Sequence, residues 1–348
     1  MKPYINPRTW KEKGLPKKIL VMRFQALGDT IITLPYINCI RQNLPNTKIH
    51  FFTRDEVAEI PRGIKLFDRV FSLGGKRNTK LQFLFCLIYL PLLLMQRYDA
   101  VIDLQNHWMS RMIRKVIGAV AWSEFDKSSP ISAGKRTAQT IQAIGFPFKI
   151  EIYPEFEIRA LSATNDLLIS NGWDGESHLV VLNPAGNFSS RNWKTENYIE
   201  LALLWLETIN PETQFVIMLT AQHFSKADQI KAALRNKCIN LSGLTTQLDA
   251  FLVLKRAKFM LSEDSGLMHM AWVQGIPTLA LFGSSRKDWS APQGESSYCL
   301  DASDLECGPC MLHECKYGTN HCLERYSINH VLTKAKALLN GSGIIPML

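Results

Sequence analysis

Residues 258–285 read KFMLSEDSGLMHMAWVQGIPTLALFGSS and contain the signals of a strand, a turn, a helix and a second strand in direct succession. The apolar run before Ser262 is typical of a buried parallel strand, and the segment after Gly266 has the period of a helix. Repeated strand–helix–strand units indicate a parallel α/β sheet. The turn EDSG, residues 263–266, therefore falls at the carboxyl edge of a sheet, where such folds bind ligands.

The same alternation runs through both halves of the chain and predicts two Rossmann-like, doubly wound domains facing a central cleft. The change in texture at FPFKIEIYPEFEI indicates a boundary near residues 150–175. We expect an N-terminal domain over residues 1–160, a C-terminal domain over 175–325, and a final helix and tail over 326–348. Expected strands lie near 18–23, 47–53, 67–72, 98–104, 178–183, 213–219, 257–262 and 277–282. Expected helices lie near 29–43, 78–97, 107–118, 134–145, 195–209, 224–235, 246–256, 265–274 and 327–340.

Charge is divided unequally along the chain. Residues 1–150 hold 24 Lys and Arg against 10 Asp and Glu, whereas the remainder holds 16 against 21. The basic half either faces an anionic partner, such as a phosphorylated substrate or a lipid surface, or is a solubilising surface. Its basic residues are scattered, without a recognition helix or an aromatic platform, so we expect no nucleic acid. The N-terminus lacks an apolar stretch, which favours a cytoplasmic location.

An apolar segment, LQFLFCLIYLPLLLM at residues 81–95, has two interpretations. It is too short to cross a bilayer comfortably and is interrupted by Pro91. One interpretation is a buried helix of the first domain. The other is a hydrophobic edge that rests on a membrane beside basic residues, which are Lys76, Arg77, Lys80 and Arg97.

Two loops of the second half are suited to phosphate. The EDSG turn opens a helix whose first N–H groups are unpaired, with a helix cap and nothing more as the alternative interpretation of Asp264. The stretch VVLNPAGNFSSRNWKTENY, residues 180–198, contains Gly186 and a Ser-Ser pair that permit close approach, and Arg191, whose guanidinium fits phosphate oxygens. An ordinary polar loop with Trp193 packed behind it is the alternative. Together the loops favour a nucleotide diphosphate site.

Another strand–helix turn lies near the N-terminus, in RFQALGDTIITLP at residues 23–35. Taken alone, Gly28-Asp29 suits either a phosphate cradle or a catalytic carboxylate. The chain has no G-x-G-x-x-G after the first strand, no Walker-A loop, no H-E-x-x-H and no G-x-S-x-G. These absences weaken assignments as an NAD enzyme, a P-loop NTPase, a zinc protease or an α/β hydrolase.

From about residue 18 to 340, the order and spacing of LGDTIITLP, DAVIDLQ, NPAGNFSSRNW and DSGLMH with GIPTLALFG resemble glycosyltransferase family 9, the lipopolysaccharide heptosyltransferases. The resemblance implies a GT-B fold and a metal-independent inverting transfer from ADP-heptose to the inner core of lipopolysaccharide, with no cofactor. It implies a phosphorylated lipid-linked acceptor, held by the first domain, and a peripheral location at the inner face of the cytoplasmic membrane. The alternatives are another nucleotide sugar, or a catalytically silent paralogue that binds a nucleotide or lipid.

The resemblance also assigns residues. Asp29 falls at the catalytic aspartate of the family, with Gly28 giving the acceptor room. The donor residues it implies are Gly186, Arg191, Asp264, Ser265, Gly266, Leu267 and His269. The chain departs from the family where an acidic residue is expected near the ribose, since Gln222 and His223 stand there.

Two further groups of residues were open to more than one interpretation. After the fourth strand, in DLQNHWMS and the helix that follows, Gln105 and Arg111 are candidate acceptor contacts, with loop capping and surface charge as the alternatives. The spacing C-x2-C-x4-C-x6-C at Cys307, Cys310, Cys315 and Cys322 suits a structural zinc, free thiols or a disulfide.

Overall fold

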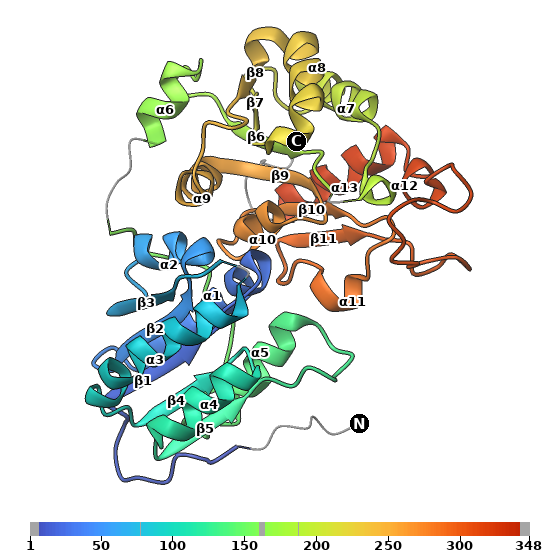
Figure 1. The fold of residues 1–348 in the computed structure, drawn as a ribbon. Coiled ribbons are helices and arrows are strands. Elements are labelled where there is room, and N and C mark those ends of the chain that lie inside the picture. Colours follow the sequence, from blue (N-terminus) through green and yellow to red (C-terminus); the bar gives the residue numbers. More distant parts are fainter. Residues whose placement is uncertain (1–6, 77, 160–163, 187, 342–348) are drawn as a thin grey trace. The chain divides into compact units, whose positions relative to one another are not determined.

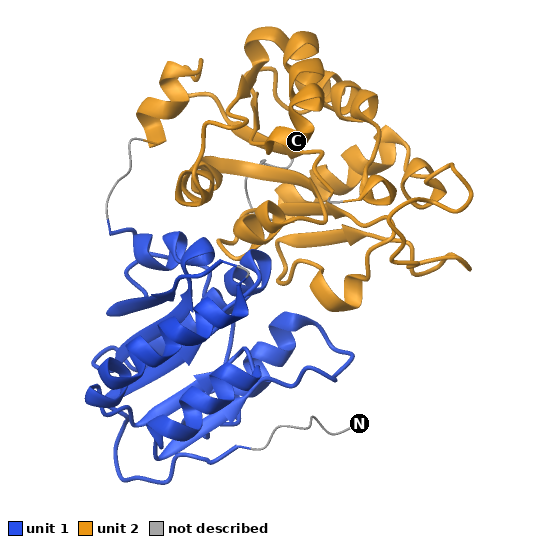
Figure 2. Ribbon diagram, viewed as in Figure 1, with its two compact units in different colours: residues 1–160 blue, residues 161–348 orange. Residues whose placement is uncertain are grey.

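The computed structural model describes residues 7–76, 78–159, 164–186 and 188–341. The chain divides into two compact units, residues 1–160 and 161–348 (Figure 2). Each unit is a parallel sheet with helices on both faces (Figure 1). Within the described parts of the chain, every helix falls short of the length and apolar character that crossing a bilayer requires.

Unit 1 is built on a five-stranded sheet with the order β3-β2-β1-β4-β5, and all of its strand pairs are parallel. Right-handed crossovers place helices that lead toward opposite edges on opposite faces. The strands are β1 (Lys18–Met22), β2 (Lys48–Arg54), β3 (Arg69–Leu73), β4 (Ala100–Asp103) and β5 (Ala121–Glu124). The helices are α1 (Leu27–Asn43), α2 (Glu59–Gly63), α3 (Thr79–Met95), α4 (Trp108–Ile117) and α5 (Ala133–Gln142).

The cores of unit 1 follow from the alternation of side chains along its strands. Leu20 and Met22 of β1 point to the face covered by α3 and α4, where they join Phe52 and Val101 in one buried cluster. Helices α1 and α5 pack against each other. Because β1 is central and fully buried, the turn that follows it is fixed at the middle of the carboxyl edge.

Unit 2 is built on a six-stranded parallel sheet with the order β11-β10-β9-β6-β7-β8. One of its cores lies under α7, α8 and α13 and includes Tyr198, Trp205 and Phe259. The strands are β6 (Leu179–Asn183), β7 (Gln214–Ile217), β8 (Cys238–Asn240), β9 (Ala257–Glu263), β10 (Thr278–Leu281) and β11 (Ser297–Leu300). The helices are α6 (Thr164–Ser170), α7 (Thr195–Thr208), α8 (Phe224–Leu234), α9 (Gln247–Arg256), α10 (Gly266–Trp272), α11 (Lys287–Ser290), α12 (His321–Glu324) and α13 (Ile328–Gly341).

The expected parallel α/β architecture is confirmed, and the differences concern short elements. Strands β5, β8 and β11, of three or four residues each, were not expected from the sequence. Helix α13, within the final helix and tail expected over 326–348, packs on α7, β10 and β11. Strand β9 lies between β6 and β10, which brings the loops after β6 and β9 next to each other.

Candidate active site

In unit 1, Asp29 lies in the first turn of α1, directly after the turn that follows β1. Its Oδ2 accepts a hydrogen bond from the backbone N–H of Ala26 at 3.2 Å and forms an ion pair with the Arg23 guanidinium at 2.7 Å. The Asp29 side chain is 42% exposed, whereas that of Arg23 is 8% exposed. A buried cation therefore holds an accessible carboxylate at the carboxyl edge of the sheet.

Two arginines around Asp29 were not anticipated from the sequence. Arg23 also donates to the carbonyl of Leu104 and lies over the Phe125 ring, 5.1 Å from its centroid. Arg136 of α5 lies over the same ring at 5.0 Å. Burial lowers the pKa of Arg136, and the negative charge of Asp29 opposes that change. One feature of the sequence indicated that Arg23 lies near Asp29. Arg23 directly follows a buried strand, at the same sheet edge as Asp29.

The loop after β4 supports the Asp29 turn. The side-chain carbonyl of Gln105 accepts the backbone N–H groups of Phe24 at 2.9 Å and Gln25 at 3.2 Å. Buried Asp103 in turn accepts the N–H of Gln105 at 3.1 Å, and burial raises the pKa of Asp103. Gln105 thus supports the turn in this structure, and its contact with an acceptor stays a prediction. Arg111 is exposed on α4, and Gly28 is the second residue of α1.

In unit 2, the loops that follow β6 and β9 meet through Asn183, which pairs in register with Ser262. The Asn183 amide donates to the hydroxyl of Ser262 at 2.8 Å and to that of Ser265 at 2.7 Å. Ser265 caps α10 by accepting the N–H of Met268 at 3.2 Å. This hydrogen-bond chain fixes the start of α10 against the end of β6.

Arg191 and Asp264, predicted from separate loops, form an ion pair at 3.0 Å. The two side chains are 13% and 12% exposed. The hydroxyl of Ser285 donates to the same Asp264 oxygen at 2.6 Å, and the guanidinium of Arg191 lies 4.3 Å from the centroid of the Phe188 ring. The buried Nε of Arg191 has no hydrogen-bond partner among the described residues. The pair therefore places a rigid, incompletely satisfied cation at the strand ends.

Glu263 organises this site and was missed as a functional residue. It is fully buried, and its carboxylate accepts the backbone N–H groups of Gly186 and Trp193, each at 2.6 Å. The hydroxyl of Tyr198 donates to it at 3.4 Å. Burial raises the pKa of Glu263 to about 7, against the opposing charge of Lys226 and these hydrogen bonds. Glu263 thus anchors both ends of the loop that carries Arg191.

The small residues of this loop have internal roles. A Cβ on Gly186 would lie 2.7 Å from the carbonyl oxygen of Arg191, so glycine allows the loop to fold back on itself. The hydroxyl of Ser189 donates to the carbonyl of His313 at 3.0 Å, and that of Ser190 donates to the carbonyl of Leu312. These contacts hold the loop against other parts of the chain, and the expectation that a ligand approaches here stays a prediction.

A hollow of about 440 Å³ adjoins the same loop. Lys226 donates to the carbonyl of Pro184 at 3.0 Å and to the side chain of Asn192, and burial lowers its pKa. Burial, followed by the charge of Lys226, lowers the pKa of His223. The lining residues are Gly186, Phe188, Ser189, Asn192, Trp193, Lys194, Thr195, His223, Lys226 and Asn320. The hollow therefore joins the Arg191 loop to the segment where the chain departs from the family pattern.

The remaining predicted donor residues all belong to α10. Gly266 and Leu267 are half-buried in its first turn. His269 is buried, and its Nδ1 accepts a hydrogen bond from the indole N–H of Trp272 at 3.0 Å. This contact holds the His269 ring against the helix.

The four late cysteines, Cys307, Cys310, Cys315 and Cys322, line one small pocket. Among the described residues, no three His, Cys, Asp or Glu side chains are arranged to hold a metal ion, and all four thiols are free. The segment is anchored through its backbone instead, because the N–H of Met311 donates to the carbonyl of Ser284 at 2.9 Å. The cysteine spacing alone could not reveal that main-chain hydrogen bonds anchor this segment.

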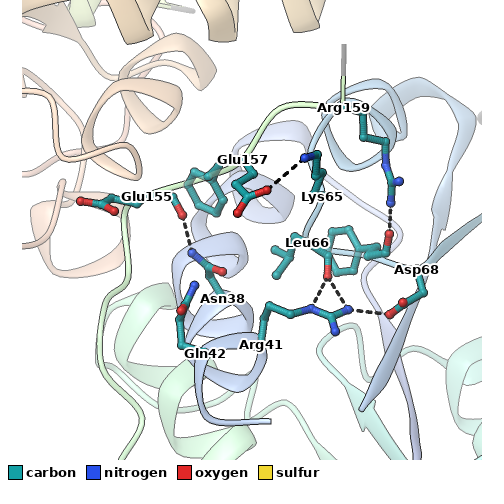
Figure 3. Close-up of a pocket in the computed structure, with 11 residues that line it drawn as sticks. Asn38, Arg41, Gln42, Lys65, Leu66, Asp68, Glu155, Glu157 and Arg159 are labelled. Carbon is teal, nitrogen blue, oxygen red and sulfur yellow. Dashed lines mark hydrogen bonds and ion pairs between the residues drawn. The ribbon is translucent and has the colours of Figure 1, made fainter. Parts of the chain in front are cut away.

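A different hollow, of about 460 Å³, lies in unit 1 near the C-terminal end of α1 (Figure 3). Two ion pairs lie among its charged side chains, since Arg41 contacts Asp68 at 2.5 Å and Lys65 contacts Glu157 at 3.1 Å. Residues 65–68 precede β3, so this hollow lies at the amino-terminal edge of the sheet. It is thus at the other edge of the sheet from Asp29.

The two parallel α/β units and their carboxyl-edge loops define the class of GT-B glycosyltransferases. The solved structure of a glycosyl transferase family 9 protein from Veillonella parvula aligns with a TM-score of 0.72 and 18% identity, covering 93% of this chain and 97% of that one. Escherichia coli ADP-heptose lps heptosyltransferase II aligns with a TM-score of 0.69 and 20% identity, covering 94% and 99%.

Sequence comparison identifies the family. The model of glycosyltransferase family 9 (heptosyltransferase) matches residues 92–321, about two thirds of the chain. The chain is also 24% identical to lipopolysaccharide heptosyltransferase 1 of Pseudomonas aeruginosa over 92% of its own length and 98% of the relative. The chain belongs to glycosyltransferase family 9 and is a transferase enzyme.

Proposed function

We propose that this enzyme transfers a heptose from ADP-heptose to the inner core of lipopolysaccharide with inversion at the anomeric carbon. Unit 2 binds the donor and unit 1 binds the acceptor. The observation that carries the proposal is the pair Arg191–Asp264, formed at 3.0 Å from two loops that match the family motifs. The heptosyltransferase relatives support the choice of sugar and acceptor.

In the proposed reaction, an acceptor hydroxyl oxygen attacks the anomeric carbon as the bond from that carbon to the ADP phosphate breaks. The electron pair of the broken bond leaves with ADP, and Asp29 takes the hydroxyl proton. Because Arg23 bonds one oxygen of the Asp29 carboxylate from its buried side, it holds the base in position. The exposed part of the carboxylate is left for the acceptor.

Negative charge develops on the departing diphosphate, and unit 2 supplies groups that stabilise it. Arg191 offers a planar guanidinium, and the first turn of α10, with Ser265, Gly266 and Leu267, offers backbone N–H groups. Asp264 lies beside Arg191 and is proposed to contact the donor sugar. The nucleotide is assigned to the hollow beside His223. In the proposed mechanism, Arg191 and the first turn of α10 stabilise the departing diphosphate without a divalent ion.

The basic N-terminal half suits the proposed acceptor, an acidic, phosphorylated and lipid-linked core oligosaccharide. Residues 1–150 carry an excess of 14 basic side chains. Gly28 and Arg111 are proposed to lie next to the acceptor, while Gln105 supports the turn that carries Asp29. Since the acceptor is anchored in lipid, we place the enzyme in the cytoplasm, at the inner face of the membrane.

A panel of nucleotide sugars, each incubated with truncated core lipids, tests the proposal. We expect ADP-heptose to add the mass of one heptose to the lipid and to release ADP, measured by mass spectrometry. No product from ADP-heptose, with product from another nucleotide sugar, would replace the donor. That second candidate is favoured by His223, which lines the hollow where the family pattern has an acidic residue. Binding without any product would indicate a catalytically silent paralogue.

A further inference from the structure

Helix α3 leaves a large apolar surface on the outside of unit 1. It packs toward the sheet through Cys86 and Leu93, which are fully buried. Seven of its large hydrophobic side chains are nevertheless exposed, by fractions from 39% to 75%: Leu81, Leu84, Leu87, Ile88, Leu92, Leu94 and Met95. The helix is therefore buried on one side, as the first interpretation of the sequence expects, and open on the other. Contiguous exposed apolar patches mark interaction surfaces.

The exposed side chains form a stripe rather than a scatter. Leu81, Leu84, Ile88, Leu92 and Met95 follow one another at intervals of three or four residues, which places them on one side of a helix. A helix of 17 residues is about 25 Å long. Residues 81–95 contain no charged side chain. A helix that only covers a sheet is polar on its outer side, and α3 is not.

Helix α4 extends the surface beside α3 (Figure 1). The rings of Phe83 and Trp108 lie 5.6 Å apart, and the sulfur atoms of Cys86 and Met109 lie 3.8 Å apart. Trp108 and Val116 of α4 are exposed as well. The apolar area thus spans two neighbouring helices, with an aromatic side chain at one end.

Basic side chains surround this apolar area. Lys76 and Lys80 lie at the N-terminal end of α3, Arg97 follows its C-terminal end, and Lys115 is on α4. All four are exposed, and none of them forms an ion pair with another described residue. Neither α3 nor α4 contains an acidic residue. Arg77, next in sequence to Lys76, lies outside the described residues.

We propose that the outer faces of α3 and α4 are a docking surface for an anionic lipid bilayer. The apolar stripe enters the boundary between headgroups and acyl chains, and the surrounding cations contact lipid phosphates. A second copy of the chain fits less well, because a two-fold interface would bring the same positive rims together. Arg111, which is proposed to lie next to the acceptor, is also exposed on α4, whereas Leu84, Ile88, Lys80 and Lys115 have no assigned part in the reaction, so substitutions at these four positions test docking separately from the proposed function.

Vesicle flotation of the full chain tests the docking surface without nucleotide or acceptor. We expect binding to vesicles of phosphatidylethanolamine and phosphatidylglycerol, and much weaker binding to pure phosphatidylcholine. The double variant Leu84→Glu/Ile88→Glu should lower vesicle affinity at least tenfold. Lys80→Glu/Lys115→Glu should lower it severalfold at low salt, with a smaller difference at high salt. These charged substitutions lie on the surface, and thermal melting checks that each variant is folded.

A matched control carries the same charges elsewhere. Ile169 on α6 and Leu203 on α7 are exposed hydrophobic residues of unit 2, and Ile169→Glu/Leu203→Glu should leave vesicle affinity unchanged. Equal binding by the wild type and Leu84→Glu/Ile88→Glu would overturn the proposal. So would a change from dimer to monomer with no change in vesicle affinity, which would assign the face to self-association. If the protein binds vesicles but transfers no sugar, only the proposed function is rejected and the docking surface stands.

Discussion

Both units place an arginine–aspartate pair at the carboxyl edge of a parallel sheet, but the two pairs are built differently. In unit 1, Arg23 is buried while Asp29 is 42% exposed, and they meet at 2.7 Å. In unit 2, Arg191 and Asp264 are exposed by only 13% and 12%, and they meet at 3.0 Å. The first arrangement leaves a carboxylate accessible, as the proposed transfer of the acceptor proton requires. The second holds a cation in place, which suits the proposed stabilisation of the diphosphate.

The largest effect should come from removing the accessible carboxylate. Asp29→Asn keeps the size of the side chain but removes its ability to take a proton, so we expect kcat to fall by about 10²–10⁴-fold. Donor affinity, measured by calorimetry with ADP, should stay within about twofold in our account. Asp228→Asn, at an exposed position on α8, is the matched control and should transfer normally. Near-normal turnover by Asp29→Asn would remove the proposed base.

The next largest loss of activity should come from changing the shape of the Arg191 side chain while keeping its positive charge. Lysine has no planar fork, so Arg191→Lys should lower kcat/KM by about 10²-fold. ADP affinity should fall together with kcat, in contrast to Asp29→Asn. Arg256→Lys, at an exposed position on α9, provides the control. An Arg191→Lys variant with unchanged kcat and ADP affinity would contradict the assignment of Arg191 to the diphosphate.

The smallest expected effect is on stability, and it concerns Glu263, which anchors the loop that carries Arg191. The pKa of Glu263 is raised to about 7 in the folded chain, from an ordinary value of 4.5. Folded protein therefore holds this proton more tightly, so the free energy of unfolding should decrease as pH rises from about 4.5 to about 7, by at most about 3 kcal/mol.

Urea denaturation across this pH range measures the effect of Glu263. Glu263→Gln should flatten the pH dependence, and it should lose about 1–3 kcal/mol of stability above pH 7 because a glutamine oxygen cannot accept both backbone N–H groups in the same way. Glu207→Gln, exposed on α7, should keep the wild-type slope. An unchanged slope in Glu263→Gln would show that Glu263 does not titrate in this range.

The sequence predicted the α/β architecture and the long elements, because short apolar runs such as residues 179–182 and 259–261 are joined by periodic helices. It also predicted that Arg191 and Asp264 share a site, since loops at the same edge of a sheet meet. It did not reveal Glu263 or Arg23 as supporting residues. Their roles depend on burial and on partners about 80 residues away, which no local pattern contains.

The outer face of α3 shows a second limit of the sequence. An apolar run predicts that a helix has a buried side, but it does not say whether the remaining sides are covered. The serines at positions 189 and 190 show the same limit for polar residues, because their hydroxyls bind carbonyls of a segment more than 120 residues further along. The exposure of α3 and the partners of the two serines both depend on contacts between segments that are distant in the sequence.

The anomeric configuration of the product tests the central claim most directly. Transfer from ADP-heptose to a truncated inner-core lipid is followed to completion, and the new glycosidic linkage is assigned by NMR. A single displacement with Asp29 as the base predicts one added heptose with a configuration opposite to that of the donor. Retention of the donor configuration would contradict the account.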